Sequence, residues 1–292
     1  LWVSPLTWWI FRAVSGFCFA VLYIVIESWL NERATPETRG TILSTYMVIN
    51  LTVLTLGQMM LPLYDPALVI LFGIGSIAVS VAALPVALAG TISPAPIASS
   101  KVDVRKLFRV SPAGVIGCAA VGLAAGSFWA LAPAYGQGKG FDTGGIALLM
   151  SVTVLGGALG QWPLGRWSDR VDRRIVLAAA AGICAAAGMY LGLRDVGSRV
   201  ELLVAAAIWG AAAFPLYSIA VAHANDFAAP DEFVQVSSGL LLTYAAGAVA
   251  GPMLAAVAIE RFGVGALFGW TAAIHAALAA FVILRVTRRS PT

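Results

Sequence analysis

The chain has 292 residues, of which 60% are hydrophobic and only 11% are charged. An ordinary soluble domain is about 45 to 50% apolar and about one quarter charged, so this composition excludes a soluble enzyme. The net charge of +4 comes from basic residues clustered between long apolar runs. This pattern is typical of loops at a membrane surface, so we expect a lipid bilayer and no nucleic acid as partners.

The sequence carries no pattern of a catalytic, metal-binding or cofactor site. Cys18, Cys118 and Cys184 are far apart, each within an apolar run, which fits neither a disulfide framework nor a metal site. The motifs G-x-S-x-G and H-E-x-x-H and the phosphate-binding loop are missing. We therefore expect no enzymatic activity, no metal and no cofactor.

Nine segments are long and apolar enough to cross a bilayer, since a span needs about 20 mostly apolar residues. Such segments must be helical, because hydrocarbon offers backbone groups no partners and the runs are too long and uniform for barrel strands. The sequence predicts an all-α polytopic membrane protein with nine transmembrane helices. We expect these helices at 8–29, 41–61, 67–89, 113–135, 144–164, 174–193, 201–222, 234–259 and 264–284.

Basic residues orient the predicted spans. Thirteen of the 18 Lys and Arg residues fall on the side of the loop 31–40, four fall on the other side, and Arg12 lies within a span. Cytoplasmic loops carry the excess of Lys and Arg, so this side, with the C-terminus, is predicted to face the cytoplasm. The polar, basic segment 91–112 is predicted to be a cytoplasmic linker.

An internal repeat relates the first predicted spans to later ones. A fixed offset aligns Asn31 with Asn225, Pro36 with Pro230, and Gly57 with Gly251. The first span then matches the seventh, so the unit has six spans and the copies are parallel repeats. We expect residues 1–90 to be the C-terminal half of a first six-helix bundle and 113–292 to be a second bundle. Three helices are then missing before the first span.

Three motifs carry a resemblance to the major facilitator superfamily. Residues 165–174, Gly-Arg-Trp-Ser-Asp-Arg-Val-Asp-Arg-Arg, resemble its G-x-x-x-D-R-x-G-R-R loop, with Asp172 in place of the glycine. Residues 12–16 resemble the R-x-x-x-G of its fourth helix. Residues 247–252 are similar to its G-x-x-x-G-P motif, which antiporters carry on the fifth helix, whereas the counterpart here reads Gly57-Gln58. The chain is thus similar to helices four to twelve of a bacterial efflux permease, a partial major-facilitator fold.

The resemblance implies a set of residues that control conformation. Asp169 would face the start of the span 41–61 near Thr38 and Gly40, where a helix dipole favours an anion. An arginine of the loop would pair with Asp226. The alternative is that these arginines only anchor the loop at the membrane interface. The full candidate set is Gly165, Asp169, Arg170, Arg173, Arg174, Asp226, Gly247, Gly251 and Pro252.

The resemblance also implies a central cavity bordered by the spans 8–29, 113–135 and 201–222. Aromatic side chains there would suit amphipathic or cationic substrates through stacking and cation–π contacts. The alternative is that these rings face lipid or pack the bundle. The candidates for the cavity and for proton coupling are Arg12, Tyr23, Glu27, Trp129, Tyr135, Gln161, Trp209, Tyr217 and Tyr244.

Glu27 is the candidate proton carrier. It shares one helix face with Tyr23 and Arg12, within about 60 degrees, but lies about 22 Å along the axis from Arg12, so the two cannot pair. A carboxyl group in a low-dielectric wall has a raised pKa, as reversible proton transfer near neutral pH requires. The alternative is an ordinary acid at the membrane interface.

Together these features favour a secondary active transporter of the bacterial inner (plasma) membrane. We expect it to move a small-molecule substrate by alternating access, with protons as the coupling partner and efflux as the direction, and to be a monomer when complete. The alternative is a non-transporting membrane scaffold or receptor derived from a degenerate transporter fragment.

Overall fold

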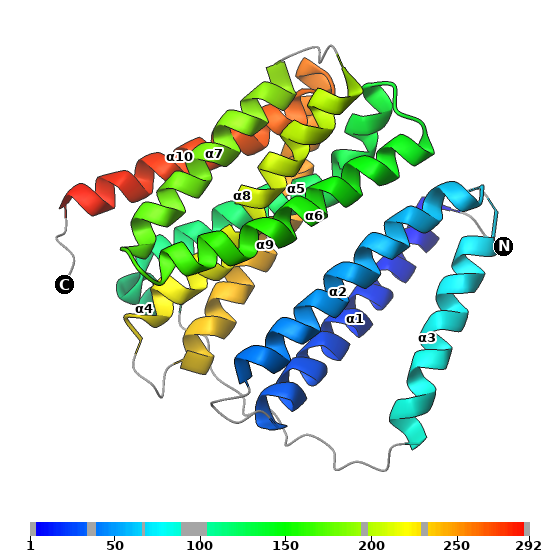
Figure 1. The fold of residues 1–292 in the computed structure, drawn as a ribbon, viewed down its shortest axis with the longest axis horizontal. Coiled ribbons are helices and arrows are strands. Elements are labelled where there is room, and N and C mark those ends of the chain that lie inside the picture. The colour runs from blue at the N-terminus through cyan, green and yellow to red at the C-terminus, as the bar shows by residue number, and fades with distance from the viewer. Residues whose placement is uncertain are drawn as a thin grey trace. The chain divides into compact units, whose positions relative to one another are not determined.

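The computed structural model describes residues 4–33, 39–65, 68–88, 104–193, 198–228 and 233–288. These residues form helices and no strand, which confirms the all-α prediction (Figure 1). The chain divides into two compact units, each described here by itself. The first unit comprises Leu1–Val53 and Val69–Ser99, and the second comprises Leu54–Leu68 and Ser100–Thr292.

The first unit holds α1 (Pro5–Arg33), α3 (Ile70–Leu88) and most of α2 (Arg39–Met60). α1 begins earlier than predicted because Ser4 caps it: the Thr7 backbone N–H donates to Ser4 Oγ at 3.2 Å, and a proline follows at the first helical position. The rings of Trp8 and Phe72 meet edge to face with centroids 6.3 Å apart, and thereby join α1 to α3.

The second unit is a helical bundle with its own hydrophobic core. Ser111, Asp142 and Ser198 each accept a hydrogen bond from a backbone N–H of the helix that follows, so three helices begin at capped positions. A short helix, α4, lies in the segment predicted as a linker. The helices are α4 (Val104–Val110), α5 (Pro112–Gly138), α6 (Thr143–Ser168), α7 (Arg173–Leu193), α8 (Arg199–Asn225), α9 (Phe233–Phe262) and α10 (Ala266–Arg288).

Small residues bring the helices of this bundle together in three tight pairs: α5 with α9, α6 with α8, and α7 with α10. A Cβ atom on Gly251 of α9 would collide with the backbone oxygen of Leu123 in α5. A Cβ atom on Gly160 of α6 would likewise collide with the backbone oxygen of Ala211 in α8. The backbones touch at these points, as is common in membrane helix pairs.

Eight of the nine predicted spans are helices long and apolar enough to cross a membrane. The exception is α2, in which the described apolar stretch, Ile49–Leu63, includes the following turn η1 (Leu61–Leu63) and is shorter than a span. A crossing by α2 therefore stays a prediction. α9 ends at Phe262, and the positive φ of 81° at the following Gly263 allows the tight turn into α10.

Candidate functional site

A cavity of about 270 Å³, here called the aromatic pocket, lies within the second unit between α5, α8, α9 and α10. None of its lining residues is an Asp, Glu, Lys or Arg, so its wall offers rings and a few polar atoms but no fixed charge. The lining residues are Val121, Ala124, Ala125, Phe128, Trp129, Trp209, Ala213, Phe214, Tyr217, Leu241, Tyr244 and His275.

Aromatic rings hold the pocket wall in place. The Phe128 ring of α5 lies 5.0 Å from Trp209 and 6.4 Å from Phe214, both of α8, measured between centroids. Across the pocket wall, Tyr217 of α8 and Tyr244 of α9 meet edge to face at 5.0 Å. Each ring is fixed by a ring from another helix, so the pocket shape depends on how α5, α8 and α9 pack.

The structure brings four of the predicted cavity residues into this one pocket: Trp129, Trp209, Tyr217 and Tyr244. It also adds His275 of α10, a helix outside the predicted cavity wall. His275 is buried, and its ring lies 6.1 Å from the ring of Trp209 at 79°. A lone histidine in an apolar helix gives no sequence signal of such a position, so only the packing of α10 reveals it.

Tyr135 and Gln161 lie outside the aromatic pocket. Tyr135 is fully buried near the end of α5, where its hydroxyl donates to the backbone oxygen of Leu191 at 2.9 Å. This contact makes Tyr135 a packing residue of the core. Gln161 of α6 is exposed, and its Nε2 donates to Ser218 Oγ of α8 at 3.3 Å. Both side chains join helices within the bundle.

The predicted candidates of the first unit lie on α1. The Arg12 side chain is exposed, and the Tyr23 side chain is 47% exposed. The side chain of Glu27 lies outside the described residues. That Arg12, Tyr23 and Glu27 present one common face of α1 therefore stays a prediction from the sequence.

A charged cluster closes one end of the second unit, where α6 turns into α7. Arg173 donates from Nε to Asp226 Oδ2 at 2.8 Å and from Nη1 to Asp169 Oδ1 at 2.9 Å. Its Nη1 also donates to Ser168 Oγ at 3.1 Å. One guanidinium thus ties the α6–α7 turn to the end of α8, and the pairing of a loop arginine with Asp226 is present. Thr38, which the prediction placed near Asp169, lies outside the described residues.

Asp172 and Arg174 form a second ion pair in the same turn. Arg174 donates from Nη2 to Asp172 Oδ2 at 2.7 Å and from Nε to Oδ1 at 3.1 Å, and its backbone N–H donates to Oδ1 at 2.9 Å. These bonds hold the pKa of Asp172 below its usual value. The backbone φ of Asp172 is not positive, so the turn does not require the glycine that the superfamily motif carries at this position.

Two other motif residues lie near this turn: Gly165 in the last turn of α6, and Arg170 between α6 and α7. The backbone oxygen of Gly165 accepts from Ser168 Oγ at 2.8 Å, and a Cβ atom on Gly165 would meet nothing within 4 Å. Arg170 is exposed. The sequence motif is therefore built around Arg173, and these two residues do not take part in its ion pairs.

The opposite end of the α6–α8 pair carries an ion pair that the sequence did not indicate. Asp142 caps α6, accepting from the Gly145 backbone N–H at 3.0 Å, and its Oδ1 also accepts from Arg199 Nη2 at 3.0 Å. Both contacts lower the pKa of Asp142. The Arg199 guanidinium also lies 4.6 Å from the Phe141 ring. Asp142 and Arg199 are far apart in the sequence, so only the alignment of α6 with α8 brings them together.

Comparison with known proteins decides the family. Residues 114–292 match the family described as the Major Facilitator Superfamily. The chain belongs to this superfamily. An uncharacterized MFS-type transporter of Yersinia pestis is 29% identical over 98% of this chain and 72% of its own length, and one of Enterobacter sp. is 29% identical over 100% of this chain and 75% of its own. No solved structure matches the chain.

Membership in the Major Facilitator Superfamily confirms the resemblance seen in the sequence. It makes the chain a multi-pass membrane transporter embedded in lipid, with a small molecule as its substrate. In the described part of the chain, no group of three or more His, Cys, Asp or Glu side chains is placed to hold a metal ion.

The superfamily-like glycine motif of α9 lies at the contact with α5. Cβ atoms on Gly247 and Gly251 would collide with backbone atoms of α5, while Pro252 lies inside the helix one residue later. The motif therefore serves, in this structure, as the surface on which α5 and α9 pack. The hydroxyl of Ser127 lies at the same contact, where it also accepts from Trp270 Nε1 at 3.1 Å.

Proposed function

We propose that this superfamily member is a proton-coupled efflux transporter that moves a small amphipathic solute by alternating access. The observation that carries the proposal is the aromatic pocket, an uncharged, ring-lined cavity of about 270 Å³ within the transmembrane bundle. Such a site binds apolar and aromatic groups through burial and stacking. Its lining comes in part from α5 and α8, two helices that the superfamily resemblance assigns to the central cavity.

We propose that the Arg173 cluster controls the alternation between two arrangements. Its two ion pairs link three chain segments at the end of the bundle opposite Asp142 and Arg199. A contact that forms in one arrangement and breaks in the other shifts the population between them. The proposal assigns this role to Asp169, Arg173 and Asp226, with Gly165, Arg170 and Arg174 shaping the turn around them.

We further propose that Glu27 carries the coupled proton, with Tyr23 one helical turn away as its neighbour and with Arg12 farther along the same helix face. Residues 1–90 and 113–292 would belong to two rocking bundles joined by the linker at 91–112. The protein would lie in the bacterial inner membrane with its C-terminus in the cytoplasm and would work as a monomer.

The test is transport by the native gene product in everted membrane vesicles. We expect uptake of an amphipathic aromatic dye to require a proton gradient and to fall at least severalfold in Trp129→Ala, which removes a pocket ring. Trp162→Ala is the matched control, since Trp162 is 70% exposed and outside the pocket. Dye uptake equal in vesicles with and without the protein would contradict the proposal, as would equal loss in both variants.

A further inference from the structure

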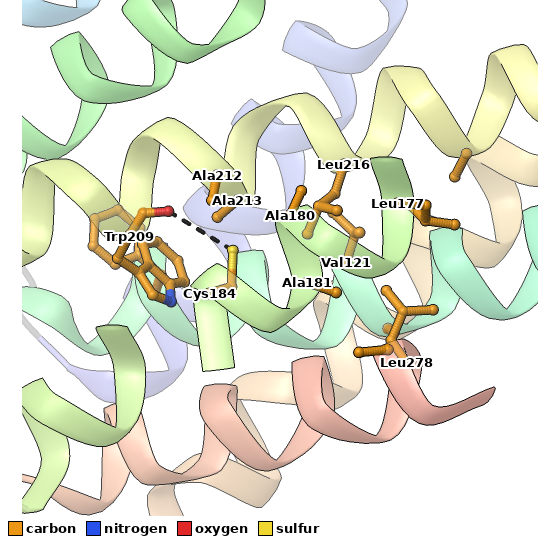
Figure 2. Close-up of a cluster of buried hydrophobic side chains, with 14 of the residues drawn as sticks. Val121, Leu177, Ala180, Ala181, Cys184, Trp209, Ala212, Ala213, Leu216 and Leu278 are labelled. Atoms are coloured by element: carbon orange, nitrogen blue, oxygen red, sulfur yellow. Dashed lines mark hydrogen bonds between the residues drawn. The ribbon is translucent and has the colours of Figure 1, made fainter. Parts of the chain in front are cut away.

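One residue that lines the aromatic pocket carries a buried donor without an acceptor. Trp209 is 1% exposed, and its indole Nε1 has no hydrogen-bond partner in the described part of the chain. Its backbone oxygen is satisfied, because the Cys184 thiol of α7 lies 3.9 Å away and donates to it (Figure 2). A buried N–H without an acceptor costs free energy, and native proteins rarely leave one unpaired. A group inside the pocket that accepts from Trp209 would remove this cost.

A histidine that lines the same pocket carries an acceptor. His275 Nδ1 lies 2.7 Å from the backbone oxygen of Thr271. A carbonyl oxygen can only accept, so Nδ1 must carry the hydrogen, and in the neutral ring Nε2 then keeps a free lone pair. His275 lines the pocket, and its ring centre lies 6.1 Å from that of Trp209. Two neighbouring residues of the pocket wall thus carry one donor and one acceptor, with ring centres 6.1 Å apart.

A single hydroxyl group can satisfy both atoms, since its oxygen accepts one hydrogen bond while its hydrogen is donated in another. An uncharged carrier fits this site better than a charged one, because the pocket wall holds no Asp, Glu, Lys or Arg and a charge there would have only ring faces as partners. The carrier should also be aromatic, because rings such as Phe128, Phe214 and Tyr244 form much of the wall.

We infer that the aromatic pocket binds an uncharged aromatic alcohol, with Trp209 Nε1 donating to its oxygen and its O–H donating to His275 Nε2. The inference deepens the proposed function by naming the substrate class for the same site. It assigns His275 and Trp209 to substrate selection and leaves the remaining rings to bind the aromatic body. An aromatic hydrocarbon of the same shape would leave both polar atoms unpaired and would bind more weakly.

The experiment measures binding of two isosteric ligand pairs to the native gene product in lipid nanodiscs, with empty nanodiscs correcting for partition. The first pair, 2-methoxynaphthalene and 2-ethylnaphthalene, tests the acceptor alone. The second pair, 2-naphthol and 2-methylnaphthalene, tests acceptor and donor together. We expect the methoxy compound to bind roughly 2- to 12-fold more tightly than the ethyl compound, the factor for one neutral hydrogen bond. The preference for 2-naphthol over 2-methylnaphthalene should be larger.

Three variants assign each preference to a residue. Trp209→Phe should abolish the preference for the methoxy over the ethyl compound, because the donor is gone. Trp270→Phe is the matched control: it also removes an indole N–H, but one already bonded to Ser127 at 3.1 Å, so both preferences should persist. His275→Phe should reduce the preference for 2-naphthol and spare that for the methoxy compound.

Equal affinities within each pair on the unaltered protein would overturn the inference, and this result does not depend on any variant folding. Persistence of the methoxy preference in folded Trp209→Phe would overturn it as well. The ligand series tests the inference, and the transport assay tests the proposed function, so either can be contradicted without the other. The expected binding order without proton-driven flux would support the inference and defeat the proposed function, whereas flux with a flat ligand series would do the reverse.

Discussion

Arg173 Nε donates to Asp226 Oδ2 over 2.8 Å and thereby joins the start of α7 to the end of α8. The two residues are distant in sequence, yet Asp226 lies where the internal repeat places Glu32 in the first copy. Both partners keep contact with solvent, with side chains 21% and 48% exposed. A partly exposed ion pair adds little to the free energy of unfolding. Such a pair is suited to an interaction that must break and re-form.

The first prediction concerns this pair. Asp226→Asn should lower the free energy of unfolding by less than about 1 kcal/mol, because the pair is partly solvated. Transport should fall much more than equilibrium substrate binding, because the pocket is untouched and the balance between arrangements is altered. Flux assays and ligand binding on one preparation measure the two effects.

Asp142→Asn is the matched control for Asp226→Asn, since it removes an ion pair at the other end of the α6–α8 pair while asparagine still caps α6. Loss of substrate affinity with an unchanged turnover rate in Asp226→Asn would contradict the assignment of this pair to conformational control.

The second prediction concerns the Asp172–Arg174 pair, whose side chains are only 19% and 11% exposed. Asp172→Asn should destabilise the protein by roughly 1 to 3 kcal/mol at pH 7, since charge-assisted hydrogen bonds are lost from a partly buried site. Its pKa is lowered in the folded state, so the stabilisation is complete above the ordinary value of 3.8 and is lost as pH falls through the lowered value.

Unfolding of the detergent-solubilised protein followed between pH 7 and pH 3 measures this dependence. The difference in stability between the unaltered chain and Asp172→Asn should shrink toward the acid end. A difference that stays constant over the whole range would show that the carboxylate charge contributes nothing.

The third prediction concerns the α5–α9 contact. Gly251→Ala places a Cβ atom against the Leu123 backbone oxygen, so the helices must move apart. We expect a loss of about 1 to 3 kcal/mol in stability. Gly182→Ala in α7 is the control, because its Cβ atom would meet nothing within 4 Å, and it should be neutral or up to about 1 kcal/mol stabilising. Thermal unfolding in detergent distinguishes the two, and equal midpoints would argue against close backbone packing.

The fourth prediction concerns topology. In a version without Cys18, Cys118 and Cys184, a single cysteine at position 170 should react with an impermeant thiol reagent only from the cytoplasm, and one at position 139 only from outside. The basis is the excess of Lys and Arg on the side of the α6–α7 turn. Labelling of position 139 from the cytoplasm alone would reverse the orientation.

The fifth prediction concerns coupling. Glu27→Gln should abolish proton-driven flux and leave substrate exchange without a gradient intact, because an amide cannot carry the proton. Asp65→Asn, which changes another acid outside the predicted spans, is the control and should transport normally. Normal proton-driven flux in Glu27→Gln would assign Glu27 to the membrane interface.

The sequence alone determined the class of this protein and the approximate position of its helices. Length and apolarity are local properties, so segments such as 113–135 and 201–222 were recognisable without knowledge of their neighbours. The same holds for the charged turn at 165–174, whose arginines cannot be buried in hydrocarbon. The short helix α4 was missed because its basic, polar surroundings resemble an irregular linker.

Only the tertiary structure decided which side chains meet. Tyr135 and Trp209 are both aromatic residues of predicted cavity helices, yet Tyr135 bonds to Leu191 in the core while Trp209 lines the pocket with an unpaired N–H. The physical reason is that lipid is as apolar as the core, so hydropathy does not fix the rotation of a membrane helix about its axis. Close glycine contacts, such as that of Gly251 in α9 with Leu123 in α5 and that of Gly188 in α7 with Phe268 in α10, set this rotation. In the resulting bundle His275 lies beside Trp209.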